Sequence, residues 1–138
     1  MNTVECNWQG DMAFELNVNN HTFIIDADDS VGGRDLGPRP KPLMLAALAG
    51  CTGMDVVSIL KKMREPLSWF NIKVNANLTD EHPKVYDKVE LVYQFRESDG
   101  LKKDNVVKAV ELSQTKYCGV SAMFKEFVSL QYRIEYLT

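Results

Sequence analysis

The chain has 138 residues, of which 45% are apolar and 25% charged, with a net charge of −3 and a pI near 5.4. This composition predicts a globular protein with one domain over residues 1–138, and the lack of a basic stripe argues against nucleic acid as a partner. The first nine residues lack the apolar core of a signal peptide. The apolar run Leu43–Gly53 is too short to cross a bilayer before Asp55, so we expect a cytoplasmic protein without a membrane span.

The first part of the chain predicts three strands. Residues 4–8 have strand composition, residues 12–18 alternate between apolar and polar side chains, and residues 21–27 run back after a tight turn at Asn19-Asn20. The irregular stretch Asp28–Lys41 follows, with three Gly, two Pro, two Arg and three Asp. It is either a solvated linker or a functional loop whose Arg and Asp side chains reach the next helix.

The element that organises the chain is a predicted helix from Pro42 to Met63, with Cys51 near its middle. Pro42 suits a first helical turn, and lysines in the last turn favour the helix dipole. Apolar residues lie on both sides of this helix, which indicates that the rest of the fold encloses it. One side carries Leu43, Ala47, Gly50, Met54 and Val57, and the other carries Leu45, Leu48, Thr52, Val56, Ile59 and Met63.

The second half predicts a hairpin of strands over residues 69–78 and 85–95, helices over 101–117 and 121–125, and a closing strand over 126–137. The order βββ-α-ββ-α-α-β is typical of an α+β fold with a largely antiparallel sheet packed around the central helix. One sheet covers only one side of that helix. We therefore expect a second copy of the chain, in a homodimer, to cover the other side.

Three cysteines carry the candidate chemistry: Cys6, Cys51 and Cys118. Together with two histidines they make no metal-ligand spacing, so we expect neither a metal nor a cofactor. In a reducing compartment a bond between cysteines would be transient rather than structural. Cys118 lies near a predicted helix start, where free N–H groups favour a thiolate, and Cys6 is read as structural.

Two motifs give the chain a family resemblance. Gly37-Pro38-Arg39-Pro40 leads into LMLAALAGCTGMDVVSILKK, and KYCGVSAM surrounds Cys118 at a helix junction. Together they resemble the OsmC/Ohr family, and most of all its small uncharacterised cytoplasmic branch. The resemblance extends over nearly the whole chain. It implies an intertwined α+β homodimer with the two central helices buried together.

The resemblance also implies an activity. Well-studied members are thiol peroxidases that reduce organic hydroperoxides, which would make Cys51 the peroxidatic residue and Cys118 the resolving one. The attack gives a sulfenic acid, a Cys51–Cys118 disulfide follows, and a lipoylated protein or another dithiol reduces it. Because Cys51 lies inside its helix, beyond most of the dipole's reach, its thiolate needs a cation, for which Arg34 and Arg39 are the candidates.

The sequence departs from the family pattern at one place. Peroxidase members hold the arginine with a Glu just after the proline that starts the central helix, and Lys41 and Pro42 stand there in this chain. Asp35 or Asp29 would have to replace that Glu. Two alternatives remain: a non-catalytic homodimeric module that binds a small apolar or thiol-reactive ligand, and a protein whose two thiols only pack in the core.

Overall fold

The computed structural model describes residues 1–138 and divides the chain into two compact units, Met1–Leu45 and Ala46–Thr138. The first unit is an antiparallel meander in which β1 (Val4–Trp8), β2 (Phe14–Val18) and β3 (His21–Ile25) pair in that order. The predicted tight turn is confirmed, because Asn19 and Asn20 both have positive φ, 50° and 64°. Trp8 is 66% exposed on β1.

Helix α1 (Pro40–Lys62) begins two residues earlier than expected and connects the two units. Its buried residues recur every fourth position, at Leu48, Thr52, Val56 and Leu60, which is one side of the helix. On the other side, Met54 is 77% exposed and Val57 43% exposed. A single chain therefore covers only one of the two apolar sides of α1.

The expectation that no segment could cross a bilayer rested on the apolar run Leu43–Gly53. Helix α1 is longer than that run. By length and hydropathy alone it is sufficient to cross a bilayer, with 22% of the apolar window buried in the protein. Core helices of soluble proteins satisfy the same criterion.

The second unit contains a sheet in the order β4-β5-β6, built from β4 (Phe70–Leu78), β5 (Tyr86–Arg96) and β6 (Ser129–Leu137). The β4–β5 pair is antiparallel, as expected, but β6 runs parallel to β5. A parallel pair needs a long crossover, because the chain must return to the starting edge of the sheet. The crossover runs through η2 (Glu97–Asp99), α2 (Lys103–Leu112), η3 (Ser113–Tyr117) and α3 (Gly119–Phe124).

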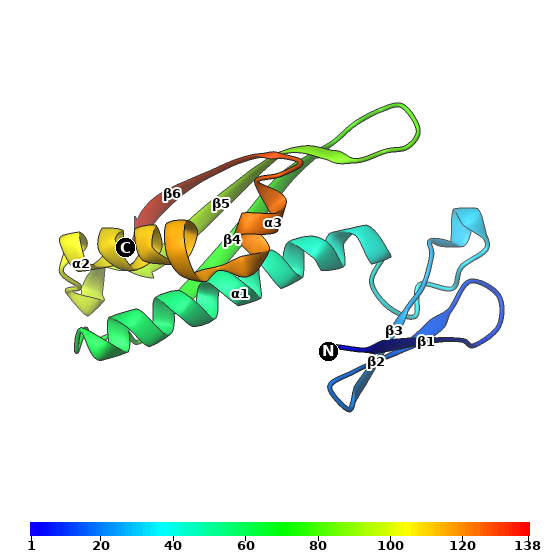
Figure 1. Ribbon diagram of the computed structural model, residues 1–138, viewed down its shortest axis with the longest axis horizontal. Helices are drawn as coiled ribbons and strands as arrows, with labels where there is room; N and C mark the ends of the chain where they lie inside the picture. The colour runs from blue at the N-terminus through cyan, green and yellow to red at the C-terminus, as the bar shows by residue number, and fades with distance from the viewer. The chain divides into compact units, whose positions relative to one another are not determined.

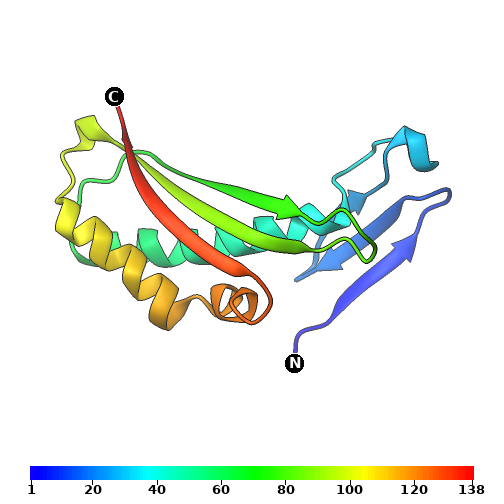
Figure 2. The same ribbon diagram turned by 90° about the horizontal axis from the view of Figure 1, so that it is seen from above.

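Within this unit, α1 and α2 lie on the same face of the sheet (Figures 1 and 2). The central strand β5 supplies most of the core on that face, where Leu91, Tyr93 and Phe95 have no exposed surface. The Phe70 ring of β4 stacks on Phe95 with centroids 4.7 Å apart. Fully buried helical residues meet this layer: Val56 and Leu60 from α1, and Val106, Ala109 and Val110 from α2.

The helix expected over residues 101–117 changes its winding before it ends. Helix α2 is regular to Leu112, and η3 is a π-helical turn. The Cys118 N–H closes this turn by donating to the Ser113 carbonyl oxygen, five residues earlier, at 2.8 Å. The wider turn lets both Ser113 and Gln114 face the interior, and π turns of this kind are frequent at functional sites.

Candidate functional site

The two cysteines expected to act together are neighbours in the second unit. Cys51, from the middle of α1, is half-buried, whereas Cys118, between η3 and α3, is only 4% exposed. Both are free thiols, and Cys51 lies close enough to act on Cys118, whose pKa it helps to raise. The β4–β5 hairpin and most of the helical crossover separate these two cysteines in the sequence, yet the fold brings their side chains into one region.

Local geometry fixes the position of Cys118. Its backbone N–H is held by the π turn, and its side chain caps α3, because the Ser121 N–H donates to Cys118 Sγ at 3.3 Å. The expectation that Cys118 lies near a helix start is confirmed. The backbone of Cys118 is thus held by η3 and its sulfur by α3.

Burial raises the pKa of the Cys118 thiol, while hydrogen bonds from the Ser121 hydroxyl and N–H act in the opposite direction. Cys51 adds to the rise, through its hydrogen bond and its charge. The net effect raises the pKa, so Cys118 is held as a protonated thiol. A buried protonated thiol is a poor first nucleophile, because the thiolate is the reactive form.

Next to the thiols lies a buried polar cluster that sequence reasoning missed. Its members are 0–5% exposed and come from α1, β5, η3 and α3: Thr52, Tyr93, Ser113, Gln114 and Ser121. Burial raises the pKa of Tyr93 to about 12, so that hydroxyl stays protonated. The available signal was Thr52, a hydroxyl among apolar residues on the inner side of α1. The five members of the cluster lie between Thr52 and Ser121, far apart in the sequence, and could not be recognised as a group.

The arginine candidates lie in the first unit, in the loop that sequence analysis singled out. The loop folds back on the end of β3, where the buried Asp26 carboxylate accepts the N–H groups of Ala27, Arg34 and Leu36 at 2.7–3.2 Å. Burial acts to raise the Asp26 pKa, but these donors outweigh it and the pKa is lowered. Gly37 permits the close approach, since a Cβ there would lie 1.9 Å from the Ile24 carbonyl oxygen.

The Arg39 guanidinium is held by two carboxylates of its own loop. It lies 2.8 Å from Asp35 Oδ1 and 3.5 Å from Asp28 Oδ2, and it also donates to the Gly37 carbonyl oxygen. Asp35 is one of the two residues expected to replace the family's Glu. The second carboxylate that contacts Arg39 is Asp28, and not Asp29, which was the other candidate. Arg34 has a more exposed side chain, and its guanidinium makes one ion pair, to Asp11 at 3.4 Å.

An apolar cavity of about 400 Å³ adjoins Arg39 within the first unit. Its walls come from β1 to β3 and the loop, and include Cys6, Met12, Phe14, Ile25, Val31 and Arg39. Cys6, read as structural, is exposed on β1 and lines this cavity. The arrangement places one cation beside an apolar space large enough for a small organic molecule.

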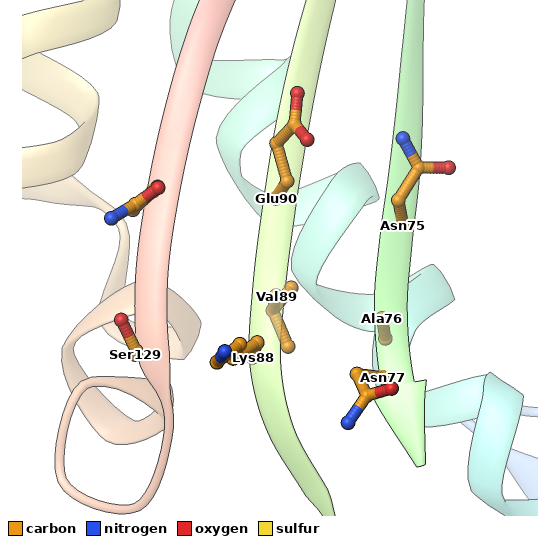
Figure 3. Close-up of a pocket in the computed structure, with 8 residues that line it drawn as sticks. Asn75, Ala76, Asn77, Lys88, Val89, Glu90 and Ser129 are labelled. Carbon is orange, nitrogen blue, oxygen red and sulfur yellow. The ribbon is translucent and has the colours of Figure 1, made fainter.

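A different hollow, of about 510 Å³, lies on the sheet of the second unit (Figure 3). Polar side chains from all three strands line it, among them Asn75, Asn77, Lys88, Glu90 and Ser129. It contains no cysteine or histidine. Nowhere in the protein do three or more His, Cys, Asp or Glu side chains gather in a way that would hold a metal ion.

The fold agrees with what the comparisons with known proteins show. The model of the "OsmC-like protein" family matches residues 32–133, more than half of the chain, and the chain therefore belongs to the OsmC-like family. The predicted α+β architecture with a central helix is confirmed by the solved structures that resemble it.

Among the proteins that this chain resembles are one sequence relative and two solved structures. Protein YhfA of Escherichia coli is 31% identical over 115 residues, which cover 83% of this chain and 82% of YhfA. A hypothetical protein from Aquifex aeolicus has a TM-score of 0.81 at 25% identity, with 100% and 98% of the two chains covered. The organic hydroperoxide resistance protein OhrB of Bacillus subtilis has a TM-score of 0.67 at 17% identity, with 97% of each chain covered.

The raised pKa of Cys118 predicts how stability depends on pH. Because the folded state holds this proton more tightly than the unfolded chain does, its contribution is full below the ordinary thiol pKa of 9.0 and is lost as pH rises through the folded pKa. Urea unfolding under reducing conditions between about pH 7 and pH 10 measures this dependence. We expect the free energy of unfolding to fall more steeply with pH in the parent protein than in Cys118→Ala. Parallel curves for the two proteins would contradict the assignment.

Proposed function

We propose that this protein is a thiol-dependent peroxidase that reduces organic hydroperoxides. The observation that carries the proposal is the pairing of a half-buried thiol, Cys51, with a buried protonated one, Cys118. A peroxidase needs one sulfur that a substrate can reach and a second that is close enough to react with the oxidised first. The organic hydroperoxide resistance protein OhrB, a structural neighbour, supports the substrate class.

The proposed reaction has three balanced steps. The Cys51 thiolate attacks the outer peroxide oxygen, the O–O bond breaks, and the alkoxide leaves and takes up a proton as the alcohol. The Cys51 sulfenic acid then condenses with the Cys118 thiol to give a disulfide and water. A dithiol, such as a lipoylated protein, reduces the disulfide to two thiols and becomes a cyclic disulfide itself.

Arg39 is the better candidate for the cation that stabilises the Cys51 thiolate. Two carboxylates fix its guanidinium and it lines an apolar cavity, whereas Arg34 has one longer contact and is 58% exposed. A pre-oriented guanidinium loses less entropy when it binds an anion than a mobile one does.

We further propose that the protein acts as a cytoplasmic homodimer, since OsmC/Ohr family members are homodimers. The outer side of α1 supports this, because a hollow of about 680 Å³ between α1 and β4 is lined by apolar and small residues such as Gly53, Met54, Val57 and Ile72. Exposed apolar surface of this kind favours association.

Peroxide titration tests the activity. We expect stoichiometric cumene hydroperoxide to form a Cys51–Cys118 disulfide in the reduced protein, as mapped by mass spectrometry. Cys51→Ser should lose peroxide consumption, and Cys118→Ser should stop at the sulfenic acid, which dimedone traps. Cys6→Ser is the matched control and should behave as the parent does. Thiols that stay free under excess peroxide would instead favour the alternative of a non-catalytic binding module.

The role of Arg39 is tested by replacing the charge and keeping the bulk. We expect Arg39→Met to slow the oxidation of Cys51 by about tenfold to a hundredfold, which corresponds to about 1.4–2.7 kcal/mol in the barrier. Arg34→Met provides the comparison and should have a smaller effect. Stopped-flow kinetics with the Cys118→Ser background isolates this step. Equal rates for the parent and Arg39→Met would remove Arg39 from the mechanism.

The homodimer is tested on the outer side of α1. We expect Met54→Asp to lower the mass measured by light scattering at micromolar concentration to that of one chain, because burying an unpaired carboxylate in an apolar interface is costly. Met54→Leu keeps the side apolar and should leave the mass at twice the chain mass. A parent protein with the mass of a single chain would refute the homodimer.

A further inference from the structure

The buried polar cluster has one consistent hydrogen-bond direction. Ser113 donates to Asp55 Oδ2 at 2.9 Å, and a hydroxyl has only one hydrogen to give. Thr52 must therefore donate to Ser113, at 2.7 Å, and Tyr93 must donate to Thr52, also at 2.7 Å. These hydrogen bonds form a series from Tyr93 through Thr52 and Ser113 to Asp55, which we call the Asp55 arm. Each hydroxyl in this arm donates in the direction of the Asp55 carboxylate.

Gln114 donates to Tyr93, the first hydroxyl of the Asp55 arm, and also to Ser121, which belongs to a second series of hydrogen bonds that we call the Ser121 arm. Its side-chain nitrogen lies 2.9 Å from the Tyr93 hydroxyl and 3.0 Å from the Ser121 hydroxyl. An amide nitrogen is only a donor, so Ser121 must accept this bond. The Ser121 hydroxyl hydrogen is thereby left for another acceptor.

The candidate acceptor is the sulfur of Cys118. The Ser121 N–H donates to this sulfur at 3.3 Å, which places the Ser121 side chain beside the thiol, and the Ser121 hydroxyl acts to lower the pKa of Cys118. Both groups favour the thiolate, against the burial that disfavours it. Gln114 and Ser121 thus hold two donors beside one sulfur in a region closed to water.

We propose that Gln114 and Ser121 are positioning residues that stabilise negative charge on Cys118 when it closes the disulfide. The inference rests on the proposed resolving role of Cys118. In that step the thiol releases its proton, its sulfur bonds to the Cys51 sulfur, and the S–O bond of the sulfenic acid breaks. The departing hydroxide and the released proton form water. Gln114 acts through Ser121, whose hydrogen it directs toward the sulfur.

The first experiment does not depend on peroxide chemistry. Carbon-13 NMR of labelled cysteine follows the ionisation of Cys118 alone in a Cys6→Ser, Cys51→Ser background. We expect Ser121→Ala to lower the thiolate fraction about tenfold at a fixed pH, the effect of losing one hydrogen bond to a charged group. Gln114→Met, of similar bulk, should lower it by less, because the hydroxyl remains but is no longer directed.

A control variant separates positioning from stability. Ser113→Ala removes a buried hydroxyl from the Asp55 arm and leaves the Ser121 arm intact. We expect it to destabilise the protein while Cys118 ionises as in the parent. Ser129→Ala and Gln131→Leu, on the exposed side of β6, serve as matched surface controls. If Ser121→Ala does not fold, Gln114→Met still tests the proposal.

The second experiment measures disulfide closure. With Cys6→Ser as the parent, we expect Ser121→Ala to slow closure about tenfold at neutral pH and to shift its pH profile upward, with Cys51 oxidation unchanged in the Cys118→Ser background. Unchanged ionisation and closure in both Ser121→Ala and Gln114→Met would overturn the inference. Failure of Cys51 to oxidise at all would refute the proposed peroxidase instead, and the NMR titration would still decide whether the two residues stabilise the Cys118 thiolate.

Discussion

The second unit depends on satisfying a polar cluster inside an otherwise apolar core. Thr52, Tyr93, Ser113, Gln114 and Ser121 are almost fully buried, and each finds its hydrogen-bond partners on another element. Leaving one buried polar group without a partner costs about 1–3 kcal/mol, a large part of the stability of a small domain. The cluster therefore fixes α1, β5, η3 and α3 relative to one another, and with them the two sulfur atoms.

The same burial creates a conflict at Cys118. A closed environment limits further oxidation of a thiol, but it also disfavours the thiolate that a resolving cysteine must become. The two donors of Ser121 oppose that effect in the structure. In the peroxidase that we propose, the cluster would reconcile protection with reactivity, whereas the half-buried Cys51 would meet the substrate.

In the loop before α1, a charged side chain, Arg39, is held by carboxylates of the same loop. Lys41 and Pro42 stand at the start of α1, and Arg39 pairs with Asp35 and Asp28 of its own loop. The backbone of this loop is held independently by Asp26. The chemical role of the loop is part of the proposal.

The sequence alone determined the strands, the central helix, the hairpin turn at Asn19-Asn20 and the family, because alternation, apolar spacing and short motifs are local signals. Only the tertiary structure decided the parallel pairing of β6 with β5, the π turn before Cys118, the pairing of Arg39 with Asp28, and the polar cluster around the thiols. Each of these depends on groups from separate elements or on a backbone winding set by packing. A pattern read along one segment does not specify which distant partner satisfies a buried hydroxyl or carboxylate.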